Sequence, residues 1–463
     1  MIKHFITKVI LINIIFNLCI AARGDIISLE ILSTRDVNNN QIYIDNELSV
    51  LSSDDFFDLN VGYGYWMYKV IYETIDKHGN PTNASGVIAF PRTDWPEEKN
   101  EAYPILSYQH GTVIQKSSVT SESGIWVLPA LIAGYGYVYL EPDYLGLGVS
   151  EGLHPYQIKD PYGTDVVDLL RAADHFSNEN NNFQINNQIF LAGYSEGGYA
   201  TMAAHQIIER DYSDEFTITS SFPMAGAYDM SGIMTEVMLD YTPYGEPYYF
   251  PYVLFAYCDN YQETLPPVTN YLTSEYAEIL PGLFDGMHSG DDINNVMPSI
   301  PITIMKADTI ISFEQNPNHP LRNALRQNDL YDWTPQSSMH IIHGLADELI
   351  PFENAQLAYD TFISNGADDI NLISIPETFG GHQDAAPICL LGAFDLAENM
   401  KIINSAGDFN EDSLIDILDI MGIVSVMLSN QYSNYQIWAA NFNEDNNIDV
   451  LDIISLVNHI LEN

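Results

Sequence analysis

Short apolar runs alternate with amphipathic stretches through most of the chain. The amphipathic stretches place apolar side chains at helical spacing, as Val167, Leu170 and Ala173 do. Short continuous runs are typical of buried parallel strands, and strands that alternate with helices predict a doubly wound α/β sheet. Strands are expected at 68–76, 84–90, 104–108, 137–140, 188–192, 339–343 and 371–375, and helices at 126–133, 164–176 and 353–364. The polar stretch 25–60 predicts only a lead-in strand or loop.

The alternation is interrupted between residues 228 and about 337. This stretch is crowded with tyrosine and proline, as in 241–244 and 247–252. Aromatic surfaces bind apolar groups, and a segment inserted between strands can exclude water from a site. We therefore expect a cap at about 228–337 that lines a substrate pocket, within a main domain that spans 25–400.

The first 22 residues have the pattern of a signal peptide. Lys3 and Lys8 precede an apolar run over 9–20, and Ala21 and Ala22 supply small residues for cleavage. No other stretch of the sequence reaches the roughly 18 apolar residues of a membrane-spanning helix. The pattern predicts a secreted protein with no transmembrane span.

Acidic residues far outnumber basic ones: 63 Asp and Glu against 16 Lys and Arg give a formal net charge of −47. A surface of this sign repels nucleic acid and anionic membranes, so neither is expected as a partner. Adaptation to salty water is the simplest interpretation, because salt screens the self-repulsion. After the signal segment two cysteines remain, Cys258 and Cys389. They can form a disulfide in an oxidising compartment or stay as two buried thiols, and the sequence leaves both open.

The segment from Gly193 to Gly197 has the G-x-S-x-G pattern of a nucleophile elbow, with Ser195 at its centre. The serine of such an elbow lies on a sharp turn between a strand and a helix, so the residues two positions away must be small. A strand is expected before this segment and a helix at about 200–208 after it. The pattern predicts Ser195 as a nucleophile.

An acid and a base are expected farther along the chain. Asp347 follows the strand at 339–343 and is the expected acid. Glu348 beside it is the local alternative, but its side chain is expected to point away from the site. His382 follows two glycines, in a loop after the strand at 371–375 and before a helix starting near 386, and is the expected base. The order Ser, Asp, His is that of α/β-hydrolases. These residues predict a triad in which the imidazole takes the Ser195 proton and Asp347 orients the ring.

A developing alkoxide also needs two backbone N–H donors. One is expected from Glu196, the residue after the nucleophile. The second is expected from the loop after the strand at 104–108, where Thr112 is the first choice and Gly111 the alternative. His110 in the same loop is expected to brace it rather than to titrate.

These motifs resemble those of the secretory lipases, an α/β-hydrolase family with fungal lipase A-type members and bacterial esterase relatives. The resemblance covers about 60–400, and its residues are Gly136-Tyr137-Val138, Pro142 to Gly148, His154-Pro155-Tyr156 and Gly193 to Gly197. It implies an α/β-hydrolase sheet with a large cap, hydrolysis of carboxylic esters, and no cofactor for catalysis. In one departure, this chain has His110-Gly111-Thr112 where the fungal members carry an acidic residue.

Residues 406–463 resemble a dockerin, a small all-α calcium-binding module. Two copies of one pattern begin at Asp408 and Asn441, and each is followed by an apolar helix, at 420–428 and 453–461. The resemblance implies structural Ca²⁺ held by oxygen ligands at Asp408, Asn410, Asp412, Asp416 and Asp419, and at Asn441, Asn443, Asp445, Asp449 and Asp452. It also implies a cohesin-type scaffold protein as partner. Asn441, in place of the usual aspartate, predicts weaker binding in the second loop.

Together these patterns favour a secreted esterase or lipase that is extracellular or attached to a cell surface. Three alternatives stay open: a polysaccharide acetyl or feruloyl esterase, a serine peptidase of the prolyl-oligopeptidase kind, and a non-catalytic adhesion protein on a hydrolase fold. Hydrolysis of p-nitrophenyl esters of graded chain length separates these hypotheses.

Overall fold

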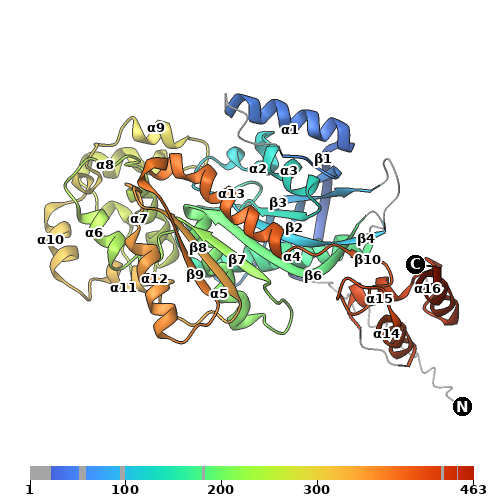
Figure 1. Cartoon of the computed structure of the whole chain (residues 1–463). Coiled ribbons are helices and arrows are strands. Elements are labelled where there is room, and N and C mark those ends of the chain that lie inside the picture. Colours follow the sequence, from blue (N-terminus) through green and yellow to red (C-terminus); the bar gives the residue numbers. More distant parts are fainter. Residues whose placement is uncertain are drawn as a thin grey trace, which may run out of the picture.

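The computed structural model describes residues 22–51, 59–93, 100–179, 183–428, 432–445 and 447–462 (Figure 1). The expected signal peptide therefore lies outside the described residues, apart from Ala22. Ten strands of the described chain form one sheet in the order β1-β2-β3-β5-β4-β6-β7-β8-β9, and β10 pairs with β4. The strands are β1 Ile26–Arg35, β2 Gly64–Ile75, β3 Pro81–Arg92, β4 Glu101–Gln109, β5 Val138–Pro142, β6 Gln184–Tyr194, β7 Ser220–Met224, β8 Ser338–Gly344, β9 Ile370–Ile375 and β10 Asn404–Ser405.

The sheet is mixed. From β1 through β2 and β3 to β5 the neighbours are antiparallel, and from β5 through β4 to β9 they are parallel. Strands β5 and β7 are buried along their whole length. The apolar start of β5 made it predictable, whereas β7 (Ser220–Met224) begins with two serines and was not expected from the sequence. The α/β architecture expected from the alternating pattern is confirmed.

Helices cover both faces of the sheet. On one face α1 (Val37–Leu51), α3 (Val127–Gly134) and α13 (His382–Met400) share an apolar cluster with the strands. On the other face lie α4 (Lys159–Glu179), α5 (Glu196–Asp211) and α12 (Glu353–Ser364). Helices α4 and α5 pack against each other as well as on the central strands. The two layers leave the carboxyl ends of the parallel strands free to build a site.

The stretch 25–60 holds the expected lead-in strand and a helix that was not expected. Strand β1 adds an antiparallel edge strand, and α1 packs on α3. Few residues of α1 are buried, so its apolar pattern is too weak to predict a helix.

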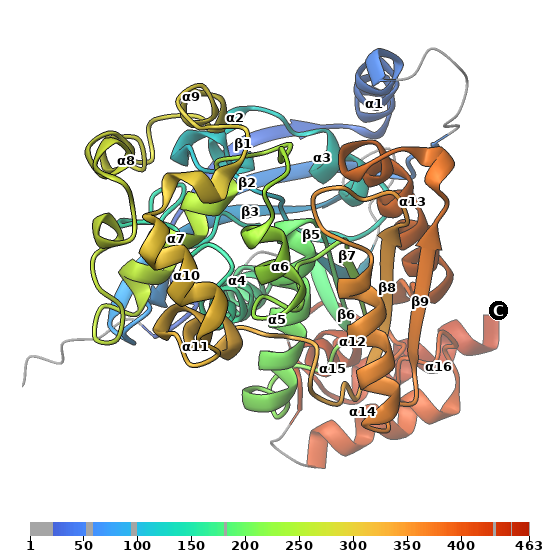
Figure 2. The same ribbon diagram turned by 90° about the vertical axis from the view of Figure 1, so that its left-hand side faces the viewer.

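The insertion between β7 and β8 forms a lobe beside the sheet (Figure 2). Its α-helices are α6 Ile233–Leu239, α7 Tyr249–Asn260, α8 Ser274–Ile279, α9 Gly290–Asn294, α10 Ala307–Gln315 and α11 Pro320–Gln327. Helix α7 is the most deeply buried of them, because nine consecutive residues from Phe250 to Cys258 pack inside the lobe. The lobe and α5 share one apolar cluster, so it is packed directly over the helix that follows Ser195.

The C-terminal segment lies at the opposite end of the molecule from the lobe (Figure 1). It consists of β10, α14 (Ile417–Leu428), α15 (Asn434–Ala440) and α16 (Val450–Glu462). Its attachment is polar as well as apolar. The Asn186 side chain donates to Asn404 Oδ1 at 2.8 Å, and Asn404 Nδ2 donates to Asp408 Oδ2 at 2.9 Å. The segment is thus bonded to the amino end of β6, the strand that leads to Ser195.

Two further findings concern membrane-spanning helices and the cysteines. Across the ranges that the structure describes, no helix is long and apolar enough to cross a membrane. Cys258 and Cys389 are both buried and unpaired, so the two-thiol alternative holds. Burial raises the pKa of each thiol to about 12, so both are protonated at neutral pH.

Candidate active site

Ser195 lies on a strained turn between β6 and α5, with φ 63° and ψ −122°. A non-glycine residue rarely adopts such angles, which cost about 1–3 kcal/mol. The turn requires small neighbours. A Cβ at Gly197 would lie 1.9 Å from the Gln109 carbonyl oxygen, and one at Gly193 would lie 2.4 Å from that of Gly197. The glycine spacing in the sequence is therefore a requirement for close packing of the backbone.

Ser195, His382 and Asp347 form a continuous hydrogen-bonded series. Ser195 Oγ lies 2.9 Å from His382 Nε2, and His382 Nδ1 lies 2.6 Å from Asp347 Oδ2. Ser195 is 8% exposed and His382 1% exposed. Because a carboxylate only accepts, Nδ1 carries the proton and Nε2 is free to accept one from the serine hydroxyl. The arrangement can therefore move a proton from Ser195 to the imidazole.

Each oxygen of the Asp347 carboxylate accepts two hydrogen bonds. Its Oδ1 accepts from the backbone N–H groups of Leu349 and Ile350 at 3.0 and 2.8 Å. Its Oδ2 accepts from His343 Nε2 at 3.1 Å, besides His382. Burial alone would raise the pKa of Asp347, but the hydrogen bonds from His343 and His382 outweigh it and lower the pKa to about 2. Asp347 is therefore ionised at neutral pH.

Two groups that sequence reasoning did not assign fix the backbone of His382. The Glu348 carboxylate accepts the His382 N–H at 2.9 Å, and the Tyr194 hydroxyl donates to the His382 carbonyl. The expectation that the Glu348 side chain points away from the site is wrong in this respect. The histidine also begins α13 rather than lying in a loop before a helix starting near 386. Glu348 accepts from an otherwise orphaned N–H of the first helical turn, which explains both differences.

The loop expected to supply the second oxyanion donor lies next to the elbow. A Cβ added at Gly111 would lie 3.5 Å from the Tyr194 carbonyl oxygen. The Thr112 hydroxyl lies 3.1 Å from the Tyr156 hydroxyl. The His110 Nδ1 and Nε2 atoms lie 2.8 and 3.3 Å from the carbonyl oxygens of Gly111 and Asp143. His110 therefore spans two loops, as a bracing residue does. Within the described chain no protein acceptor takes the N–H of Thr112 or of Glu196.

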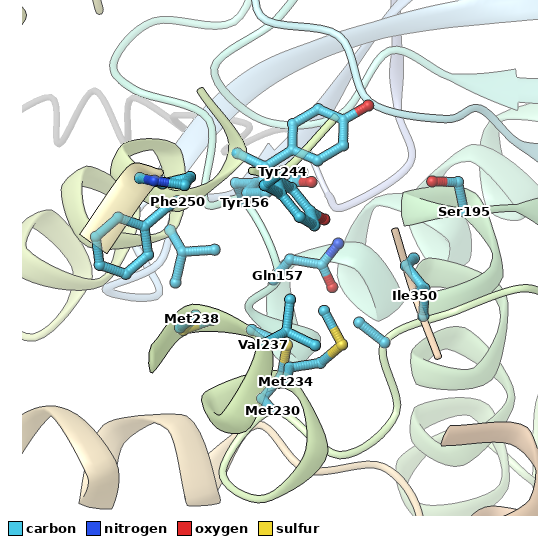
Figure 3. A pocket seen from close by; sticks show the side chains of 14 residues that line it. Tyr156, Gln157, Ser195, Met230, Met234, Val237, Met238, Tyr244, Phe250 and Ile350 are labelled. Carbon is cyan, nitrogen blue, oxygen red and sulfur yellow. The ribbon is translucent and has the colours of Figure 1, made fainter. Parts of the chain in front are cut away.

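A pocket opens beside Ser195. Figure 3 shows Ser195 at one end and three methionines, Met230, Met234 and Met238, across the cavity from it. The remaining lining residues come mostly from the inserted lobe and are Tyr156, Gln157, Ala227, Val237, Tyr244, Tyr249, Phe250, Val253, Pro301 and Ile350. The lining is mainly apolar and aromatic, so the cavity suits an apolar chain.

Comparison with known proteins places this geometry in context. A family model described as Secretory lipase matches residues 108–244, which include Ser195 and both glycines of the elbow. A protein of Legionella pneumophila described as a hydrolase is 25% identical and has a TM-score of 0.71, over 81% of this chain and 97% of its own. The protein is a carboxylic ester hydrolase.

Other solved structures have the same fold as this ester hydrolase. The rice cell wall degrading esterase LipA from Xanthomonas oryzae is 24% identical, with a TM-score of 0.71 over 82% of this chain and 99% of that chain. Candida antarctica lipase A in its closed state is 15% identical, with a TM-score of 0.60 over 82% of each chain. Among curated proteins, none matches the sequence.

The C-terminal loops of the ester hydrolase are distant from Ser195. Both loops have the same hydrogen-bond pattern, in which side chains at positions 3, 5 and 9 accept from the N–H two residues later. In each loop the aspartate at position 12, Asp419 or Asp452, is fully buried and accepts backbone N–H groups. Over the described residues, no three His, Cys, Asp or Glu side chains converge as a ready metal site. A cation would therefore have to draw the loop oxygens together.

Proposed function

We propose that the protein is a secreted serine esterase in which Ser195 is the nucleophile, His382 the general base and Asp347 the residue that orients and stabilises the imidazolium. The observation that carries the proposal is the series of hydrogen bonds of 2.9 and 2.6 Å joining these three side chains on a strained elbow. Four further hydrogen bonds support the series: three that Asp347 accepts and one from the His382 N–H to Glu348.

In this proposal Ser195 Oγ attacks the ester carbonyl carbon while His382 Nε2 takes the hydroxyl proton. The carbonyl oxygen becomes an oxyanion that accepts from the N–H groups of Glu196 and Thr112. When the tetrahedral intermediate collapses, the ester C–O bond breaks and His382 returns the proton to the departing alcohol. Water then attacks the acyl-serine with His382 again as base, which releases the acid and restores Ser195.

The cavity supports an ester with an apolar acyl group. Methionine side chains are flexible and polarizable, so the three that face Ser195 can adapt to acyl chains of different shape. The structural similarity to a rice cell wall degrading esterase favours testing acetyl and feruloyl esters of cell wall polymers as substrates, with the polymer as the alcohol part. The acyl group would then enter the cavity while a polymer stays outside.

Turnover of p-nitrophenyl esters from acetate to palmitate tests the proposal, with Ser195→Ala as the inactive variant. We expect a maximum at short or medium chains and loss of activity in Ser195→Ala with an unchanged unfolding midpoint. Ser123→Ala, at the end of the short helix α2 (Thr120–Ser123), is the matched control and should keep full activity. Activity that survives Ser195→Ala would overturn the proposal.

We also propose that the C-terminal segment is a calcium module that attaches the enzyme to a cohesin-type scaffold outside the cell. The donor set fits calcium: both loops present Asp and Asn oxygens in one repeated geometry, and Asp408, Asp419 and Asp452 are buried. The sequence has no lysine or arginine after Lys401 to offset these charges. Calcium bound there would supply that charge and tie each loop to the helix that follows.

Isothermal titration of the full-length enzyme with Ca²⁺, after removal of metal by chelation, tests the calcium proposal. We expect two binding events, with the weaker one lost when Asp452 is replaced by alanine. A panel of immobilised cohesins tests the partner. Binding should depend on calcium and on exposed apolar pairs such as Ile417 and Leu418, which are 68% and 51% exposed. Binding that persists in excess chelator would contradict the attachment.

A further inference from the structure

A buried histidine–glutamate pair lies directly behind the nucleophile. His154 Nε2 is 2.7 Å from Glu196 Oε1, and the two residues are 2% and 0% exposed. Glu196 follows Ser195 and begins α5, so its backbone and side chain act in different places. The backbone N–H is the proposed oxyanion donor, whereas the carboxylate points into the protein toward His154. The proton transfer described above does not use either side chain.

The contacts of this pair determine its proton content. His154 Nδ1 faces the Leu145 carbonyl oxygen at 2.8 Å, which only accepts, so Nδ1 carries a proton. Nε2 faces a carboxyl oxygen at 2.7 Å, and two bare lone pairs do not approach so closely. One further proton therefore lies between the ring and Glu196. Whichever side holds that proton, the pair as a whole is electrically neutral.

The tyrosine next to the pair does not change this result. Tyr162 accepts the Gln157 N–H at 3.1 Å and donates its own hydroxyl proton to Glu196 Oε1 at 2.7 Å. Burial raises the pKa of Tyr162 well above its usual value, so its hydroxyl stays protonated. Glu196 Oε2 has no hydrogen-bond partner within the described chain. Among the described residues, His154 is therefore the one group that contacts Glu196 and can compensate its charge.

Neutrality matters because of where the carboxyl group lies. The oxyanion that forms on the substrate is stabilised by N–H dipoles at the start of α5, and an uncompensated carboxylate on the same residue would oppose it. The low dielectric of a buried site strengthens this opposition relative to water. The same charge would perturb binding of an uncharged ester much less.

We propose that His154 is a positioning residue that neutralises Glu196 and so preserves the electropositive oxyanion hole of the esterase. The inference rests on the proposed role of Ser195 and of the Glu196 N–H. It assigns a function to the His-Pro-Tyr segment that precedes α4, which the triad leaves unexplained. The predicted signature is a change in kcat rather than in KM.

The same helix offers a matched control pair. His205 Nε2 lies 2.9 Å from Glu209 Oε1, and His205 is fully buried like His154. This pair is about 15 Å farther along α5, at 1.5 Å of rise per residue. Losing it should affect stability through similar chemistry without reaching the oxyanion. The control separates a charge effect at the site from a general cost of disturbing a buried pair.

The experiment is a double-mutant cycle on the full-length enzyme, with kcat and KM measured on p-nitrophenyl butyrate and unfolding followed for each variant. His154→Gln keeps a hydrogen-bond donor near Glu196 but removes the ring that shares its proton. Ionised Glu196 is then uncompensated, so we expect kcat to fall about 100-fold with KM nearly unchanged. Adding Glu196→Gln removes the stranded charge and should recover about tenfold of that loss. His205→Gln, alone or with Glu209→Gln, should leave kcat unchanged.

The outcomes separate this inference from the proposed function. If the double variant is no more active than His154→Gln, or if His205→Gln lowers kcat equally, the charge-compensation role is wrong. That result leaves the triad intact, provided that Ser195→Ala is inactive. If Ser195→Ala is active, the proposed function itself fails. Rescue of kcat by the second substitution, with similar unfolding midpoints for both variants, supports the inference.

Discussion

Buried carboxylates in the hydrolase domain and in the C-terminal segment have different partners. Asp347 shares its charge with two imidazoles, His343 and His382, whereas Asp408 and Asp419 accept only backbone and amide N–H groups. Burial would raise the pKa of Asp347, but the histidine hydrogen bonds outweigh it and lower the pKa to about 2. Burial raises the pKa of Asp419. The Asp347 carboxylate thus has charge-compensating partners within the protein. The C-terminal loops hold negative charge that an external cation can satisfy.

The largest effect should come from His382→Ala. Removing the base leaves Ser195 without a proton acceptor, so kcat on p-nitrophenyl butyrate should fall by about 10⁴-fold or more. Calcium affinity by titration calorimetry should not change, since the C-terminal loops lie at the other end of the molecule. His175→Ala, at a half-exposed site on α4, is the control and should retain wild-type kcat. Substantial activity in His382→Ala would mean that the hydrogen-bonded series is not the catalytic one.

Gly197→Ala should be the most damaging small change to the hydrolase fold. The added Cβ would lie 1.9 Å from the Gln109 carbonyl oxygen, so strand β4 or the elbow must move. We expect a loss of about 3 kcal/mol in the free energy of unfolding, measured with urea. Gly392→Ala makes the same change in α13, where the new Cβ meets nothing within 4 Å, and should stabilise the protein slightly. Equal stability of the two variants would contradict the packing argument.

Asp419→Ala should affect only the C-terminal segment. The variant loses three backbone hydrogen bonds to a buried carboxylate and the proposed twelfth ligand of the first loop. We expect loss of one calcium-binding event and a decrease of about 2 kcal/mol in the stability of this segment, with kcat unchanged. The exposed Asp395→Ala on α13 removes the same charge and should leave calcium binding as it was. Full calcium binding by Asp419→Ala would show that the loops do not act as proposed.

The smallest effect concerns Asp329, in the lobe, and depends on pH. Burial raises the pKa of Asp329 to about 6, although hydrogen bonds from Ser231 oppose the shift. The stability that its protonated form contributes is therefore complete below about pH 4 and is lost as the pH rises through about 6. Asp329→Asn should raise the unfolding free energy by about 1 kcal/mol at pH 8 and leave it unchanged at pH 4.

Thermal unfolding at both pH values measures this difference, with the exposed Asp368→Asn as control. A gain at pH 4 as large as at pH 8 would exclude titration of Asp329 as the cause. The two pH values also show how far the hydrogen bonds from Ser231 stabilise ionised Asp329, as the histidine hydrogen bonds stabilise ionised Asp347.

The sequence located Ser195, Asp347 and His382 because each follows a strand and the three occur in a characteristic order. It did not identify His343, Glu348 or Tyr194 as their supports. These contacts depend on how β8, β6 and α13 meet in space, and no periodicity or spacing along the chain encodes such a meeting. Most of the central strands were predictable because burial on both faces leaves apolar runs. Strand β7 is the exception, since its buried sequence begins with two serines and contains a proline.

Helix α1 shows the opposite case. It lies at the surface with few buried side chains, so its residues carry little apolar periodicity and only its packing on α3 reveals it. The start of α13 at His382 was also hidden, because a histidine after two glycines is typical of a loop. The N–H contact with Glu348 decides the matter, and that contact joins residues on different elements.

The hydrogen bonds that join Asn186, Asn404 and Asp408 set how the hydrolase domain would be oriented on a scaffold protein. Strand β6 begins near this link and ends next to Ser195, so the C-terminal segment and the proposed active site lie at opposite ends of one strand. A scaffold protein bound to the C-terminal segment would therefore leave the pocket beside Ser195 facing away from it, toward a substrate in the surroundings.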